Sequence, residues 1–276
     1  MNKSAGKIVT VFFGACFMLF FCLLPFIYML LVSLSSRTDF LNSPAGLILT
    51  FRNFIEIVNS PSSHFIYYLR NSMLISLVSA LLSVFIASLA AYAITRLAMP
   101  GKMGLLLFVV SVSMFPQISV VGYLFKFMSG LNWINTYQAL VLPYVAWTLP
   151  LSLCILVSYF NKLPRDLDKA AFVDGCSKFQ ILFRVIIPAA RPGVIAAFLL
   201  AFLFSYNEFI FALMLTIDHN ARTTPVAIAL LQNLDGKLPW GHIMAASVLV
   251  TLPIFILAFI YQRNIVSGLT KTVIKG

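Results

Sequence analysis

Charge is scarce in this sequence. Of its 276 residues, 19 are Lys or Arg and 8 are Asp or Glu, so charged residues make up 10% and hydrophobic residues 61%. The mean hydropathy of +0.98 is high for a water-soluble chain. Apolar surface on this scale does not fit inside one soluble core, which excludes a cytosolic enzyme, a disulfide scaffold and a disordered tail. The sequence therefore predicts an integral membrane protein.

Patterns that bind metals, nucleotides or nucleic acids are also missing from the sequence. The four cysteines show no metal-ligand spacing. No G-x-x-x-x-G-K-[ST] loop is present to cradle nucleotide phosphates. The net charge of +11 comes without a basic groove of interleaved stacking aromatics. We therefore expect no catalytic residue, no metal site and no bound cofactor in this chain, and no nucleic-acid partner.

Gaps between charged residues locate the predicted membrane spans. A charge at the centre of a spanning helix costs roughly 2.5 to 3.5 kcal/mol, so spans fall where charge is absent. Six gaps hold the ~20 apolar residues that cross the hydrocarbon core. The predicted spans are residues 8–35, 71–95, 103–125, 136–160, 192–217 and 242–262. Because these runs are continuously apolar rather than alternating, we predict an all-α membrane protein with six transmembrane helices in one domain of residues 1–276.

Basic residues predict the orientation of the chain. With the amino terminus inside, the inner segments carry 13 of the 19 Lys and Arg residues and a net charge of +10, against +1 outside. The positive-inside rule then predicts that both termini are cytoplasmic. The basic turn of residues 96–102 is an inner turn on this reading, and we interpret its charges as topological signals only.

The inner loop of residues 161–191 has a pattern of its own. Residues 165–173 predict a helix, Asp174-Gly175 predicts a break, and residues 177–188 predict a second, amphipathic helix. Two short helices joined by a turn outside the membrane form either a docking element or an interfacial pair that lies on lipid. The pattern alone leaves both interpretations open.

This loop resembles a known motif. The run from Ala170 to Gly175, A-A-x-x-D-G, followed by Val185-Ile186-Ile187-Pro188, resembles the EAA loop of ABC importer permeases, and it falls between predicted spans four and five as in that family. Phe115-Pro116, Tyr206-Asn207-Glu208 and the segment 262–276 look like the carbohydrate branch, and within it the second permease of maltose and trehalose importers. One departure is Lys169, which stands where the motif usually has Glu.

The resemblance implies a transport subunit rather than an enzyme, in a bacterial or archaeal plasma membrane. ATP and Mg would be bound by partner ATPase subunits, not by this chain. The implied partners are a second permease subunit in a heterodimer, two ATPase subunits, an extracytoplasmic sugar-binding protein, the sugar substrate and membrane lipid. The implied cargo is a disaccharide such as trehalose or maltose, moved by alternating access.

The resemblance also assigns the coupling to the ATPase to particular residues. In the family the EAA helix seats in a cleft of the ATPase, so Gly175 would permit the tight turn and Asp174 would cap the next helix. A second ATPase contact is expected at the tail, Lys275 and Gly276. The full set of implied coupling residues is Asp168, Lys169, Ala170, Ala171, Asp174, Gly175 and Pro188.

Polar and aromatic groups inside the predicted spans are candidates for the translocation path, because hydrocarbon tolerates polar groups that face a cavity or a partner. Glu208 is the one charged residue within a predicted span, and a buried helix–helix hydrogen bond is its alternative role. Pro116 predicts a kink in span three. The candidate path residues are Phe115, Gln117, Tyr206, Asn207 and Glu208.

Two other classes of function fit the sequence less well than an importer. An ion-coupled secondary sugar transporter needs coupling-ion residues and usually internal repeats, and one intramembrane carboxylate in a chain without repeats gives it little support. A membrane enzyme needs a convergent set of nucleophile, base or metal ligands, which three scattered histidines do not supply.

Overall fold

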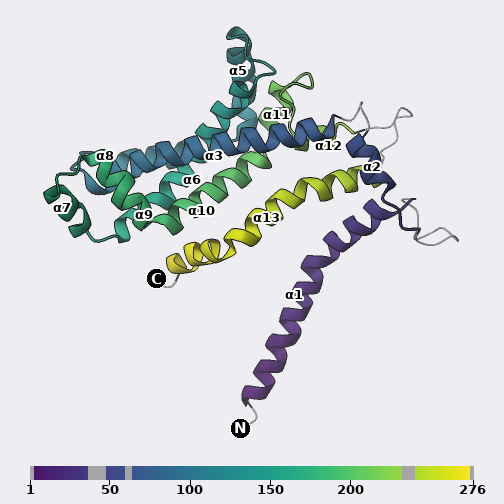
Figure 1. Ribbon diagram of the computed structural model, residues 1–276, viewed down its shortest axis with the longest axis horizontal. Coiled ribbons are helices and arrows are strands. Elements are labelled where there is room, and N and C mark those ends of the chain that lie inside the picture. Colours follow the sequence, from purple (N-terminus) through teal and green to yellow (C-terminus); the bar gives the residue numbers. More distant parts are fainter. Residues whose placement is uncertain (1–2, 37–47, 60–63, 232–239, 274–276) are drawn as a thin grey trace. The chain divides into compact units, whose positions relative to one another are not determined.

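The computed structural model describes residues 3–36, 48–59, 64–231 and 240–273 (Figure 1). These residues form helices, and their only bridge pairing is an isolated one between Ser35 and Leu49. The prediction of an all-α fold is confirmed. The chain divides into a smaller unit, Met1–Ile66 with Ile228–Pro253, and a larger unit, Tyr67–Ala227 with Ile254–Gly276.

Four helices among the described residues are long and apolar enough to cross a membrane on their own. They correspond to predicted spans one, two, four and six. Prolines inside three of them, at Pro25, Pro143, Pro150 and Pro253, leave the helices unbroken. The helices are α1 (Lys3–Leu34), α3 (Phe65–Arg96), α6 (Tyr137–Lys162) and α13 (Trp240–Val273).

Predicted span three is broken rather than kinked. Helix α4 (Lys102–Ser113) and helix α5 (Gln117–Gly130) meet at an angle of 88°. Between them Pro116 is extended, with φ −70° and ψ 132°. Proline has no N–H to donate and disfavours helical geometry at the residue before it, so the first helix ends and a new one starts just after the ring.

Predicted span five, residues 192–217, is not one helix either. Helix α10 (Arg191–Tyr206) stops at Tyr206, and a separate helix α11 (Ile210–Leu215) follows. The Asn207 side chain donates to the carbonyl of Leu203, in the last turn of α10, at 2.9 Å. The same carbonyl also accepts from the backbone N–H of Asn207 at 3.1 Å, so the side chain adds a second bond at the point where α10 ends.

The loop between α6 and α10 contains two helical segments, as predicted. Helix α7 spans Asp166–Val173. The second segment runs through α8 (Lys178–Ile181), a π-helical turn at Leu182–Ile186 and α9 (Ile187–Ala189), and it meets α10 at 86°.

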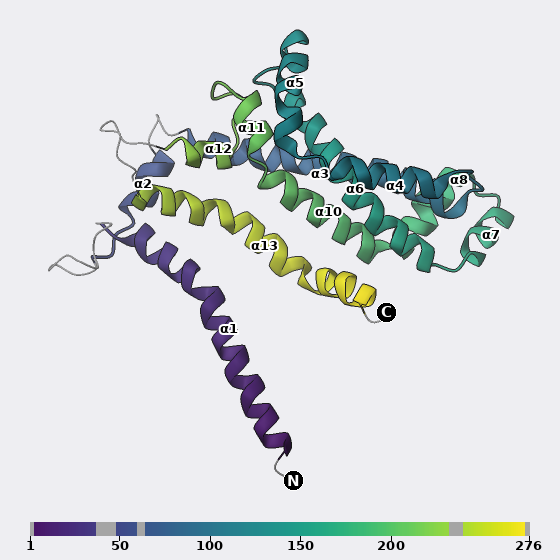
Figure 2. The same ribbon diagram turned by 180° about the vertical axis from the view of Figure 1, so that it is seen from behind.

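The core of the larger unit holds this second segment in place. Helix α6 packs against both α4 and α10 (Figure 2). Leu182 and Ile186 are buried in one apolar cluster with Leu156 and Phe160 of α6 and Ala197 of α10. The loop is therefore fixed to the long helices by apolar packing as well as by the chain itself.

A second apolar cluster of the larger unit joins the two short helices that follow the breaks. Helices α5 and α11 pack together. Met128 of α5 and Leu215 of α11 are buried in this cluster with Leu140 and Tyr144 of α6. The polar pair Ser72 and Thr224 attaches helix α12 (Thr224–Ala229) to α3 through a hydroxyl–hydroxyl contact of 2.9 Å.

In the smaller unit, helix α2 (Arg52–Asn59) contacts the ends of two long helices. The Asn53 amide donates to backbone carbonyls at the end of α1, and a carboxylate oxygen of Glu56 lies 2.7 Å from Nε2 of His242 at the start of α13. Hydrogen bonds from Arg52 and then from His242 lower the pKa of the Glu56 carboxyl.

Candidate functional site

Both helix breaks of the larger unit open onto one hollow of about 830 Å³. Irregular backbone at membrane depth is tolerated where it lines a cavity or is buried in protein, so a shared hollow explains why both breaks persist. The lining residues come from the start of α5, from α6 and from the α10–α11 break. They are Pro116, Gln117, Ile118, Trp147, Leu200, Leu203, Phe204, Asn207, Glu208, Phe209 and Ile210.

The hollow brings together three of the five candidate path residues. Gln117, Asn207 and Glu208 line it, although 90 positions separate the first from the second. Phe115 and Tyr206 do not. Phe115 is 63% exposed outside the hollow, and Tyr206 is 1% exposed, with its ring stacked on Phe202 at a centroid distance of 5.5 Å.

Glu208 is held by the backbone of the helix that follows it. Its carboxylate accepts hydrogen bonds from the N–H of Phe211 at 2.8 Å and of Ala212 at 3.2 Å. A negative group at these first N–H groups satisfies donors that a helix start leaves unpaired. The hydroxyl of buried Tyr144 lies near this carboxylate without the geometry of a hydrogen bond. Glu208 therefore both lines the hollow and caps α11.

Aromatic side chains supply much of the remaining wall, and sequence reasoning missed them. Trp147 of α6 is half-buried in the hollow and meets Phe211 edge-on at a centroid distance of 6.2 Å. Phe204 and Phe209 are exposed there. An aromatic within a long apolar run carries no signal of its own, so only the fold distinguishes these rings from those that face lipid.

The turn after α7 is a Schellman motif with glycine at its left-handed position. Gly175 has φ +81°, and its N–H donates to the carbonyl of Phe172 at 3.0 Å. The N–H of Cys176 donates to the carbonyl of Ala171 at 3.0 Å. These two bonds close the end of α7, and a side chain at the glycine would be strained even though the space around it is open. The predicted tight turn at Gly175 is confirmed.

The predicted cap of the second loop helix is wrong. Asp174 is the last residue of the α7 end, and Ser177 caps α8 instead. The Ser177 hydroxyl accepts from the N–H of Gln180, and the Gln180 side chain accepts from the N–H of Ser177 at 2.8 Å. This reciprocal capping box requires a cap residue directly before the helix, and Asp174 is three residues too early.

The other predicted coupling residues occupy two faces of α7 and the end of the loop. Ala171 is buried at 7% exposure, whereas Ala170 is exposed. Lys169, at the position where the motif usually has Glu, pairs with Asp166 at 3.0 Å on the exposed surface. Pro188 lies exposed in α9, and the predicted tail contact at Lys275 and Gly276 falls outside the described residues.

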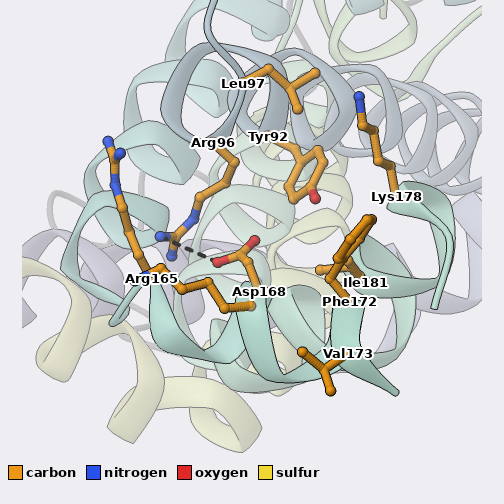
Figure 3. Close-up of a pocket in the computed structure, with 10 residues that line it drawn as sticks. Tyr92, Arg96, Leu97, Arg165, Asp168, Phe172, Val173, Lys178 and Ile181 are labelled. Atoms are coloured by element: carbon orange, nitrogen blue, oxygen red, sulfur yellow. Dashed lines mark ion pairs between the residues drawn. The ribbon is translucent and has the colours of Figure 1, made fainter. Parts of the chain in front are cut away.

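Arg96 anchors α7, a role that sequence reasoning missed by interpreting its charge as topological. Its side chain is 5% exposed and forms an ion pair with Asp168 at 3.4 Å (Figure 3). It also donates to the carbonyls of Phe160 at 2.9 Å and Leu163 at 3.0 Å. Beside it lies a groove of about 390 Å³ between the end of α3 and the loop helices.

The structure offers no metal site within the ranges it describes. No group of three or more His, Cys, Asp and Glu side chains is arranged there to hold an ion.

Residues 83–271 match the family described as the binding-protein-dependent transport system inner membrane component. The chain belongs to this family, the permease subunits of ABC importers. Across its whole length it is 49% identical to all of the trehalose/maltose transport system permease protein MalG of Thermococcus litoralis. It is also 40% identical to the trehalose transport system permease protein SugB of Mycobacterium tuberculosis, with 75% of this chain and 76% of that protein covered.

Solved structures show the same fold. A chain of a bacterial ABC transporter involved in the import of the acidic polysaccharide alginate matches with a TM-score of 0.78 at 18% identity, covering 95% of this chain and 96% of that one. At such low sequence identity the match shows only that the two chains share a fold. The expected all-α permease fold is confirmed, and the relatives are transport subunits rather than enzymes.

Proposed function

We propose that this chain is the permease subunit of an ATP-driven importer that moves a sugar, specifically a disaccharide such as trehalose or maltose, into the cytoplasm by alternating access. The observation that carries the proposal is the hollow at the two helix breaks, read together with the 49% identity to a trehalose/maltose permease. The size of the hollow, about 830 Å³, suits a small ligand.

The walls of the hollow suit a sugar. The amides of Gln117 and Asn207 both donate and accept, which matches sugar hydroxyls, and Trp147 offers a flat apolar ring for the C–H face of a pyranose. The Glu208 carboxylate already accepts hydrogen bonds from N–H groups of α11, so its oxygens can accept fewer hydrogen bonds from a sugar. A second permease subunit would complete the path, since this chain supplies only the lining residues described above.

The loop suits coupling to an ATPase. Phe172 and Val173 of α7 are 70% and 84% exposed, an apolar surface that calls for a protein partner. We assign the coupling contact to α7, with Asp168 to Ala171, Asp174 and Gly175 shaping it and Pro188 ending the loop. ATP and Mg then belong to two ATPase subunits on the cytoplasmic side, where both termini of this chain lie, and an extracytoplasmic binding protein delivers the sugar.

Replacing Gln117 tests the path. In vesicles that contain the complete importer, Gln117→Leu removes the amide from the hollow while keeping a side chain of similar size. A sugar hydroxyl left without its partner costs about 1–3 kcal/mol, so we expect uptake of labelled trehalose and maltose to fall by about tenfold or more. ATP hydrolysis stimulated by the binding protein should persist.

The matched control is Gln138→Leu, the same change at an exposed glutamine of α6 outside the hollow. It should leave uptake unchanged. Equal uptake by Gln117→Leu and the unmodified importer would show that sugar does not pass this hollow.

A further inference from the structure

Arg96 is a buried cation at the end of a long helix. It is the last residue of α3, and 5% of its side chain is exposed. A buried charge is costly unless it is both paired and hydrogen-bonded, so the contacts of Arg96 hold its surroundings in a defined arrangement. Those contacts reach two other elements of the larger unit.

The first element is the end of α6. The Arg96 guanidinium donates to the carbonyls of Phe160 and Leu163 at 2.9 and 3.0 Å. The last carbonyls of a helix have no partner within it and carry partial negative charge, so a guanidinium satisfies them and favours the helix dipole. Arg96 thereby fixes the point at which the chain leaves α6 for the loop.

The second element is α7. Asp168 has 19% of its side chain exposed, and Arg96 is its ion-pair partner at 3.4 Å. Neither carboxylate oxygen has a hydrogen bond within the described structure. Figure 3 shows the carboxylate turned toward the guanidinium and away from the exposed Val173. Loss of Arg96 would leave a largely buried carboxylate without a counter-charge.

The contrast with Lys169 identifies which charge of α7 matters for anchoring. Lys169 and Asp166 form a pair whose side chains are 76% and 85% exposed, a kind of pair that contributes little. The Arg96–Asp168 pair faces the long helices. Together with buried Ala171, it is what fastens the middle of α7 to the rest of the larger unit.

We propose that Arg96 is a positioning residue that makes α7 move as one body with the ends of α3 and α6. This inference rests on the proposed function, in which α7 receives the movement of an ATPase. With the anchor in place, a displacement of α7 is passed to two long helices, one of which, α6, carries Trp147 into the hollow. Without Arg96, α7 can move with the ATPase subunit while the long helices do not follow.

The test compares sugar transported per ATP hydrolysed in vesicles that contain the complete importer. Asp168→Asn keeps the size of the side chain and removes its charge, and the exposed apolar surface of α7 is untouched. We expect ATP hydrolysis to continue and the ratio of sugar transported to ATP hydrolysed to fall about fivefold or more. A change of this size is expected when a typical coupling free energy between two sites is lost. Arg96→Gln should lower the same ratio, and the double variant should be no worse than Arg96→Gln.

The matched control is Asp166→Asn, which removes an exposed carboxylate from the same turn of α7 and should leave the ratio unchanged. A merely structural role would lower the amount of assembled importer without altering the ratio. If the unmodified importer requires ATP and Asp168→Asn leaves the ratio unchanged, this inference alone is overturned. Uptake by the unmodified importer without ATP would overturn the proposed function instead.

Discussion

At Gly193, α10 lies against the ring of Tyr159 of α6. A Cβ added at this residue would lie 2.3 Å from Cγ of Tyr159, and two more ring atoms of Tyr159 would be within 2.7 Å. The ring is partly buried and packs against a core cluster, so it has little room to move aside. Gly193 and Tyr159 can lie this close because glycine has a hydrogen atom where other residues have a Cβ.

We therefore expect Gly193→Ala to destabilise the protein by about 1–3 kcal/mol, the usual cost of overpacking a core. The measurement is the thermal unfolding of the purified chain in detergent. Gly104→Ala is the control, since nothing lies within 4 Å of a Cβ at that helical position. Equal unfolding temperatures for the two variants would mean that the α6–α10 contact is looser than described.

Individual roles at the residue scale were only partly predictable. Gly175 followed from the sequence because a turn of this kind needs a left-handed residue and glycine is the residue that supplies it at low cost. Arg96 did not, since the carbonyls it binds lie more than 60 positions away, at Phe160 and Leu163. A basic residue near a membrane surface has the same linear pattern whether it sets topology or anchors a loop.

At the scale of elements, the start of α8 depends on a capping box. Ser177→Ala removes the hydroxyl that accepts from Gln180 and frees the Gln180 side chain. Loss of such a cap costs about 1 kcal/mol, so hydrogen exchange at residues 178–181 should speed up by about fivefold. Asp174→Ala should leave exchange at these amides unchanged, because Asp174 ends α7. Faster exchange in Asp174→Ala than in Ser177→Ala would restore the cap that the sequence suggested.

The two helix breaks differ in how visible they are in the sequence. The first follows Pro116, whose ring predicts a disturbance, although the full 88° bend depends on packing of α5 against α11. The second has no proline or glycine. Asn207 and Glu208 end one helix and start the next through hydrogen bonds that a hydropathy profile does not register. Continuous apolar runs therefore predicted longer helices than the chain forms.

For the molecule as a whole, composition was enough to predict an all-α membrane protein, because scarce charge confines the chain to lipid-facing helices. The four long helices coincide with four of the predicted spans, and the two bent pairs account for up to two more. The loop motif predicted the family, which residues 83–271 confirm. The hollow was not predictable in full, since Trp147, Gln117 and Glu208 meet only through tertiary packing.

The central claim is that ATP hydrolysis by partner subunits drives sugar through this chain, and uptake by sealed vesicles tests it most directly. The vesicles contain this chain with its second permease and ATPases, and the sugar-binding protein is supplied on the extracytoplasmic side. Uptake of labelled trehalose or maltose should require ATP on the ATPase side and should continue when proton and sodium gradients are collapsed. Uptake that proceeds without ATP and stops when an ion gradient is removed would contradict the account and favour a secondary transporter.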